Sequence, residues 1–241
     1  MSDSNIVILL KGGRLPTWYG LAGEDQDAIS QEHVDLMLSV ATQHRMLRIE
    51  GYRLLSPVHS WERFWVIEFS TLNGAEAWIE AELAPPYGRY GYYEYHLARR
   101  YQNTLYNGLA SPDRQIKAKG SDDPHGIPTL KADLNSLVVL QFKRWSADAI
   151  DMPKDQRGDE KQRGRAQSVA GTHSLISLES FKLLSPQADW VETTIIEFPD
   201  FVGAEAWLEA ENSQPHSMYT VQSMYLSRRW CPEYFDTWAS P

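Results

Sequence analysis

The pentapeptide "GAEAW" occurs twice in this chain, at residues 74–78 and again at 203–207, and each copy follows a stretch that contains "IEF". The same offset of 129 residues places "GYRLLSP" over "SFKLLSP", and no gap is needed between these matches. From Ser39 to Arg100, 26 of 62 positions are identical to the residue 129 positions later. This identity is far above chance, so the sequence predicts two copies of one unit.

The duplication predicts the domain boundaries. We expect a first repeat over residues 1–105, a linker over 106–133 and a second repeat over 134–241. The linker is rich in Gly, Pro, Asp and Lys, a composition that is typical of a surface connection.

Hydrophobic periodicity predicts the elements of the first repeat. The expected order is a strand (5–12), a helix (27–46), two strands ("LRIEGYRLLS" and "ERFWVIEFS"), a second helix and a last strand ("YGYYEYHLARR"). Thr71 and its counterpart Asp200 are good N-caps for the second helix of each repeat. The order β-α-β-β-α-β indicates an α+β fold, a ferredoxin-like repeat with four antiparallel strands and two helices on one face.

The strands carry apolar side chains on both faces, which a half-covered sheet does not explain. In "ERFWVIEFS", Trp65 and Ile67 point to one face while Phe64 and Val66 point to the other. The face without helices must therefore also be buried. We expect the two repeats to pack sheet to sheet as a pseudo-twofold α/β barrel.

Composition narrows the functional classes. A net charge of −9 disfavours nucleic acid as a partner, and no apolar run approaches the roughly 20 residues that cross a bilayer. One cysteine and the absence of a leader-like start predict a cytoplasmic protein without disulfides. Nine Trp and twelve Tyr favour a pocket for a small molecule. A homodimer is left open.

The stretches "IIEFPDFVGAEAWLEAE" and "VIEFSTLNGAEAWIEAE" resemble the strand-to-helix signature of the dimeric α/β-barrel superfamily, closest to its small members that read E-F-P-S-x-x-x-A-x-x-W. The resemblance implies a fused version of an assembly that usually forms from two chains. That superfamily includes cofactor-free monooxygenases, muconolactone isomerase, stress-responsive barrels and haem proteins such as chlorite dismutases. Shared fold does not carry one chemistry to another member.

The last strand of the first repeat carries more ionisable and aromatic side chains than the last strand of the second repeat. Glu94 and His96 are two residues apart on a strand, so both side chains share a face and are candidates for an acid/base pair, with His44 as a third catalytic candidate. The predicted substrate contacts are aromatic or cationic: Trp18, Tyr19, Trp65, Tyr93, Tyr95 and Arg99. The seven histidines show no metal-binding spacing, so no metal site is predicted.

Three functions follow from these features. The first is an enzyme that acts on an aromatic or apolar substrate without a nucleotide cofactor, by oxidation, isomerisation or elimination, as a cofactor-independent monooxygenase, isomerase or lyase. No cofactor is predicted, although haem or a metal ion is left open. The second is a ligand-binding or stress-response barrel without catalysis. The third is a haem protein in which His33, His44, His96 or His173 is the axial ligand.

Overall fold

The computed structural model describes residues 5–58, 60–109, 128, 130, 132–153, 156–186 and 189–235. The chain divides into two compact units. The N-terminal unit contains Ser4–Ala98, Lys117–Asp133 and Arg229–Pro241, and the C-terminal unit contains Met1–Asp3, Arg99–Ile116 and Leu134–Arg228. Most of the predicted linker 106–133 lies outside the described residues.

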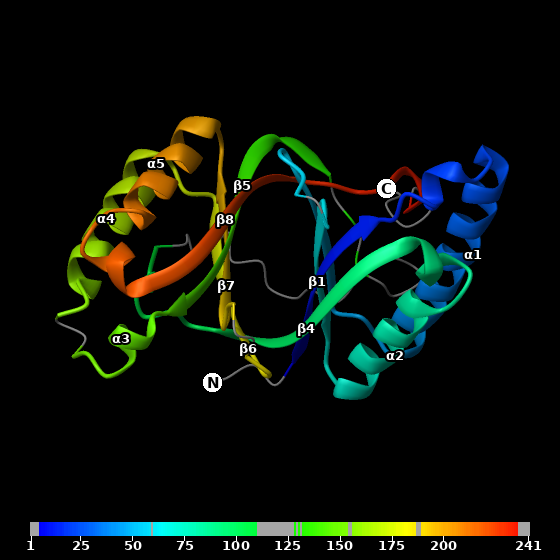
Figure 1. Cartoon of the computed structure of the whole chain (residues 1–241), viewed down its shortest axis with the longest axis horizontal. Coiled ribbons are helices and arrows are strands. Elements are labelled where there is room, and N and C mark those ends of the chain that lie inside the picture. The colour runs from blue at the N-terminus through cyan, green and yellow to red at the C-terminus, as the bar shows by residue number, and fades with distance from the viewer. Residues whose placement is uncertain are drawn as a thin grey trace. The chain divides into compact units, whose positions relative to one another are not determined.

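The N-terminal unit is built on four antiparallel strands in the order β4-β1-β3-β2. Helices α1 and α2 cover one face of this sheet (Figure 1). The elements are β1 (Ile6–Arg14), η1 (Trp18–Gly20), α1 (Gly23–Gln43), β2 (Arg48–Leu54), β3 (Arg63–Phe69), α2 (Leu72–Leu83), η2 (Tyr87–Tyr90), β4 (Gly91–Tyr101) and η5 (Glu233–Phe235).

The C-terminal unit repeats this order with one added short helix. Its strands lie in the order β8-β5-β7-β6, and α4 and α5 cover one face. The elements are β5 (Asp133–Trp145), α3 (Ala147–Ile150), α4 (Asp159–Thr172), β6 (Ser177–Leu183), β7 (Glu192–Phe198), α5 (Phe201–Glu211), η4 (His216–Tyr219) and β8 (Thr220–Arg229). The chain is therefore α+β, as the sequence predicts.

Alternation along the strands places the core between sheet and helices. In the N-terminal unit, Ile8 and Leu10 of β1 belong to the same buried cluster as Val34 and Met37 of α1. Trp78 on α2 is 2 % exposed and joins this cluster, so it is a core residue.

Helix α1 ends earlier than its hydrophobic pattern predicts. The expected helix over 27–46 is observed as Gly23–Gln43. Arg45 adopts a φ of 52°, in the left-handed region that a continuing helix cannot use. The backbone N–H of Met46 then donates to the carbonyl of Ala41, which completes the last turn.

Both predicted N-caps are confirmed. The Thr71 hydroxyl accepts from the N–H of Gly74 at 3.3 Å, and the Asp200 carboxylate accepts from the N–H of Gly203 at 3.0 Å. Each bond satisfies a donor that the first turn of a helix leaves without a partner.

We expect Thr71→Ala and Asp200→Ala each to lower the free energy of unfolding by about 1 kcal/mol, because each change removes this bond. Urea denaturation measures the change, with Ser70→Ala at an exposed neighbouring position as the control. A loss no larger than that of the control would contradict the capping role.

The first strands of the two units differ in register. In β1, Ile8 lies opposite Ile67, whereas in β5 the residue opposite the equivalent Ile196 is Val139. Val139 lies 131 residues after Ile8, not 129. Gly12 therefore corresponds in space to Lys143, and Leu10 corresponds to Gln141.

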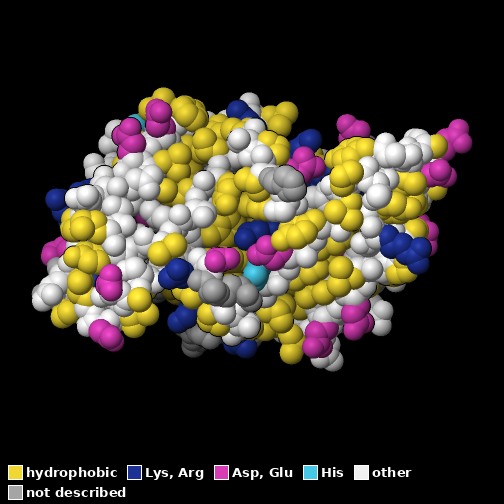
Figure 2. Space-filling model, in the orientation of Figure 1, with side chains coloured by type: hydrophobic (Ala, Val, Ile, Leu, Met, Phe, Trp, Pro, Cys, Tyr) yellow, Lys and Arg dark blue, Asp and Glu magenta, His cyan; other side chains and the backbone are white. Residues whose placement is uncertain are grey.

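None of the described helices is long and apolar enough to cross a bilayer. On the face that Figure 2 shows, Lys and Arg side chains are scattered among acidic and hydrophobic ones rather than gathered into one broad patch.

Candidate functional site

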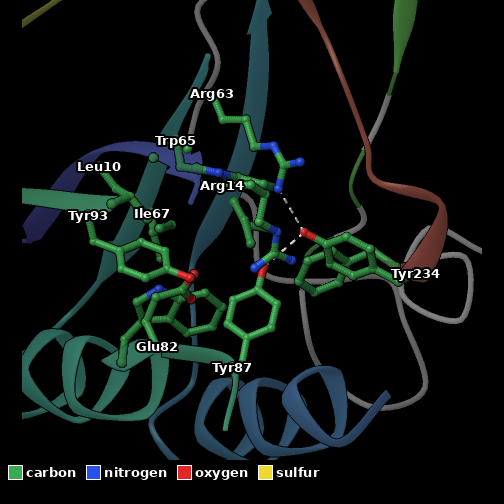
Figure 3. A pocket seen from close by; sticks show the side chains of 14 residues that line it. Leu10, Arg14, Arg63, Trp65, Ile67, Glu82, Tyr87, Tyr93 and Tyr234 are labelled. Carbon is green, nitrogen blue, oxygen red and sulfur yellow. Dashed lines mark hydrogen bonds between the residues drawn. The ribbon is translucent and has the colours of Figure 1, made fainter. Parts of the chain in front are cut away.

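A pocket opens between the sheet and the helices of the N-terminal unit (Figure 3). It measures about 450 Å³ when the space at its open mouth is included. Its enclosed part has room for about one or two water molecules. The residues that line it come from four strands, α2, η2 and the C-terminal turn: Leu10, Gly12, Gly13, Arg14, Ile49, Arg63, Trp65, Ile67, Trp78, Glu82, Tyr87, Tyr93, Tyr234 and Phe235.

Arg14 is one of two arginines that line this pocket. Its guanidinium carbon lies 4.0 Å from the ring centre of Trp18 and 4.0 Å from that of Tyr87. Such cation–π contacts hold the group in place while leaving its N–H donors unused. Nη1 and Nη2 are both buried and have no hydrogen-bond partner among the described residues. A buried, unsatisfied guanidinium is costly, and a carboxylate would satisfy it with two parallel bonds.

A second arginine and two tyrosines lie beside Arg14. The Arg63 guanidinium donates to the Tyr234 hydroxyl at 3.4 Å, and the hydroxyls of Tyr234 and Tyr87 are 3.1 Å apart. Figure 3 shows Arg14 and Arg63 both directed toward Tyr234. Burial raises the pKa of Tyr87 and of Tyr93, so these hydroxyls stay neutral near pH 7 and act as hydrogen-bonding groups. The Tyr93 hydroxyl is buried and has no partner among the described residues.

Glu82 is the acidic group of the pocket. It lies near the end of α2 and is 8 % exposed. Among the described residues its ionic contact is with His33, whose Nε2 lies 3.5 Å from Oε2, a distance at which a hydrogen bond is weak. The His33 ring stacks on Tyr87 with ring centres 3.6 Å apart. Within the described part of the chain, the Arg14 guanidinium and the Glu82 carboxylate of this pocket therefore have few partners.

The predicted acid/base pair lies on the other face of the same sheet. His96 Nε2 is 2.6 Å from Glu94 Oε1, and Lys11 Nζ is 3.0 Å from the same oxygen. The hydrogen bond from His96, with the Lys11 charge, lowers the Glu94 pKa to about 2. Because neighbouring residues of a strand point to opposite faces, Glu94 and His96 point away from the side that carries Tyr93. The structure brings the pair together, apart from the pocket.

The other predicted site residues are spread more widely. Trp65 and Tyr93 line the pocket. Trp18 contacts Arg14, Tyr95 stacks on Tyr93 with ring centres 6.1 Å apart, and Tyr19 is 66 % exposed. His44 follows the end of α1, with its Cβ close to Gly74, and Arg99 belongs to the C-terminal unit.

Sequence reasoning missed Arg63, Glu82, Tyr87 and Tyr234. Glu82 carries a usable signal, because it is identical to its partner Glu211 in the second repeat. Tyr234 carries none, since it comes from a turn far along the chain and reaches the pocket only through the fold.

The corresponding place in the C-terminal unit is filled by side chains. Glu211 accepts hydrogen bonds from the Tyr106 hydroxyl at 2.8 Å, from Gln141 Nε2 at 2.7 Å and from Gln162 Nε2 at 2.8 Å. Lys143 Nζ lies 3.5 Å from the same carboxylate and 2.9 Å from His216 Nε2. This buried network leaves Glu211 fully satisfied.

No family of known proteins and no curated protein matches the sequence. Solved structures do match the fold. Chlorite dismutase from Candidatus Nitrospira defluvii in complex with imidazole aligns with a TM-score of 0.69 and 11 % identity over 100 % of this chain and 97 % of that one. A second protein, whose predicted activity is that of chlorite dismutase, aligns with a TM-score of 0.60 and 12 % identity over 96 % of each chain. Identities this low show a shared fold.

This finding overturns two predictions. The solved structures that share this fold are chlorite dismutases, which the resemblance above counts among haem proteins, and this contradicts the leading expectation of a cofactor-free enzyme for an aromatic or apolar substrate. The expectation that no cofactor is involved is wrong for the same reason.

The described residues of the pocket do not provide the usual ligands of haem iron. His, Cys and Met are missing from the residues that line it, and the raised pKa values of Tyr87 and Tyr93 oppose the phenolate that would bind iron. The His33 ring is covered by Tyr87. The described residues also contain no cluster of three His, Cys, Asp or Glu that would hold a metal ion.

Proposed function

We propose that this chain is a small-molecule binding protein with the chlorite dismutase fold, and that the pocket of its N-terminal unit binds an organic carboxylate. The observation that carries the proposal is Arg14, a guanidinium held between two aromatic rings with both terminal nitrogens buried and unsatisfied at the pocket wall.

The surroundings of Arg14 support an anion as the ligand. Arg63 adds a second positive charge on the same side of the pocket (Figure 3). Its Nε lies 3.3 Å from Glu62, so Arg63 is partly neutralised, whereas Arg14 has no such partner among the described residues. A carboxylate that accepts from Nη1 and Nη2 of Arg14 would remove the unsatisfied donors and make a charge-assisted pair. The Tyr93 hydroxyl adds a further hydrogen-bonding group.

Replacement of Arg14 tests this function. We expect wild type to bind propionate, butyrate or valerate in calorimetric titrations, and Arg14→Gln to bind them at least about tenfold more weakly, because charge-assisted hydrogen bonds are lost. Arg163→Gln, at an exposed position of α4, is the matched control for loss of one positive charge. Equal binding by wild type and Arg14→Gln, or no binding of any carboxylate by wild type, would contradict the proposal.

Haem is the second candidate, and the shared fold is the observation that favours it. Titration with hemin distinguishes the two. A stoichiometric Soret band that persists through gel filtration would show that this chain keeps the cofactor of its structural relatives, and would contradict a carboxylate as the main ligand. Absorbance of free hemin alone would leave the carboxylate proposal standing.

Several finer predictions remain part of this proposal. They are the assignment of the two units as tandem ferredoxin-like repeats, their sheet-to-sheet packing, a cytoplasmic location and a homodimer. Glu94, His96 and His44 stay predicted as acid/base groups. Trp18, Tyr19, Tyr95 and Arg99 stay sequence predictions of ligand contacts, and none of the four is among the residues that line the N-terminal pocket.

A further inference from the structure

Comparison of the two units indicates which chemical group the ligand carries in addition to its carboxylate. Glu82 in the N-terminal unit and Glu211 in the C-terminal unit are equivalent residues at the ends of α2 and α5. Both are at least nine-tenths buried. A buried carboxylate needs donors or a countercharge. Only Glu211 is fully supplied with them by the described residues.

Three of the four groups around Glu211 are absent around Glu82. By strand register, Gln141 is replaced by Leu10 and Lys143 by Gly12. Tyr106 is replaced by Phe235, which occupies the same position in an equivalent turn: the N–H of Tyr106 donates to Asn103 and that of Phe235 donates to Pro232. Leu10, Gly12 and Phe235 have no side-chain donor, and all three line the pocket.

The fourth group around Glu211, Gln162, is replaced around Glu82 by another side chain that can donate a hydrogen bond. Gln162, which donates to Glu211 at 2.8 Å, is replaced by His33, whose Nε2 lies 3.5 Å from Glu82. Glu82 therefore lines a pocket that lacks the lysine amine and two other donors of the C-terminal unit, while its carboxyl group is kept (Figure 3).

Gly12 marks the place that the lysine side chain fills in the other unit. A Cβ built on Gly12 would contact the Tyr92 carbonyl at 3.8 Å and the Tyr93 ring at 3.9 Å, which are ordinary contacts. The glycine is therefore not required by crowding at its Cβ. In the C-terminal unit the Lys143 side chain extends from the equivalent position to Glu211 and His216. Gly12 has no side chain, so it does not fill the corresponding space in the N-terminal unit.

We infer that the ligand of the N-terminal pocket carries an ammonium group that takes the place of the lysine amine beside Glu82, in addition to the carboxylate at Arg14. The ligand class is a small zwitterion of the amino-acid type. This inference rests on the proposed function, because it assumes the carboxylate at Arg14. Opposite charges on the ligand match the cation and the carboxylate that the pocket leaves with few partners.

Matched probes test the ammonium end. Titrations of wild type compare β-alanine, γ-aminobutyrate and 5-aminovalerate with propionate, butyrate and valerate, which have the same chains without the amine. We expect at least one amino acid to bind about tenfold or more tightly than its matched acid, as a hydrogen-bonded charge pair allows. In Glu82→Gln this preference should fall to about twofold or less, while binding of the simple acid persists. Glu80→Gln, exposed on the same helix, should behave as wild type.

A second variant copies the C-terminal unit into the N-terminal one. In Gly12→Lys the new lysine should occupy the place of the ligand amine, so binding of the amino acids should weaken at least about tenfold. Gly164→Lys, which adds the same charge to an exposed position of α4, is the control. Circular dichroism establishes that both variants are folded, and Glu82→Gln decides the matter if Gly12→Lys is not.

The outcomes separate the two proposals. Carboxylates that bind through Arg14 without any preference for the amine would overturn the zwitterion and leave the proposed function intact. Failure of every carboxylate and every amino acid to bind would overturn both. An amine preference that survives in Glu82→Gln would also overturn the zwitterion assignment.

Discussion

Glu211→Ala is expected to lower the free energy of unfolding by about 3 to 5 kcal/mol, the largest loss we expect from a single substitution in this chain. The glutamate is fully buried and accepts three side-chain hydrogen bonds. Its removal leaves Lys143, which is 3 % exposed, without a countercharge at 3.5 Å. The loss of stability comes from the buried charge of Lys143 and from the hydrogen-bond donors that are left without an acceptor, rather than from the attraction within the ion pair itself.

Urea denaturation of Glu211→Ala and of Glu209→Ala measures this effect. Glu209 lies on the same helix and is exposed, so its replacement should change stability by less than about 0.5 kcal/mol. A loss below about 1 kcal/mol for Glu211→Ala would show that water or rearranged side chains replace the network.

Acidification is expected to destabilise the protein through His216 by up to about 3 kcal/mol. Burial, with the positive charge of Lys143, lowers the pKa of His216 from 6.5 to about 4. The groups that face its ring are Lys143, Glu211 and Asp159, and Arg165 adds a further positive charge.

The sign follows from proton uptake by the unfolded chain. As pH falls below about 6.5, histidine in the unfolded state takes up a proton while the folded state does not, so stability falls until the pH reaches about 4. Glu50 and Glu94, whose pKa values are lowered to about 2, lose their contributions only at more acidic pH, below about 4.5.

Urea denaturation of wild type and of His216→Tyr between about pH 7 and pH 4 isolates the histidine. Tyrosine is the residue at the equivalent position of the N-terminal unit, Tyr87, and it does not titrate in this range. We expect the decline in stability over this interval to shrink in the variant. An identical decline in both proteins would show that His216 is protonated in the folded state.

Much of each unit could be predicted from local sequence. Strand alternation, the helical period and the caps at Thr71 and Asp200 are properties of neighbouring residues, and the structure agrees with them. The end of α1 could not be predicted, because the left-handed backbone of Arg45 is not encoded by a glycine. The added helix α3 was likewise not expected.

The site was predicted less well than the fold. Trp65 and Tyr93 line the pocket, but Glu94 and His96 meet on the opposite face of the sheet. A separation of two residues on a strand predicts that both side chains lie on the same face of the sheet. It does not predict which face carries the pocket. That choice depends on where the helices pack.

The sequence alone determined that 26 of 62 positions are identical at an offset of 129 residues, and its periodicity predicted the order of the main strands and helices, because neighbouring residues set that periodicity. Only tertiary structure decided the register of the first strand in each unit. The pairing of β5 with β7 is shifted by two residues relative to the pairing of β1 with β3, which places Lys143 where the other unit has Gly12. It also decided that Tyr234 and Phe235 reach a pocket beside Arg14. Strand register and long-range packing arise from contacts between distant segments, so one unit is filled by its own side chains and the other is open.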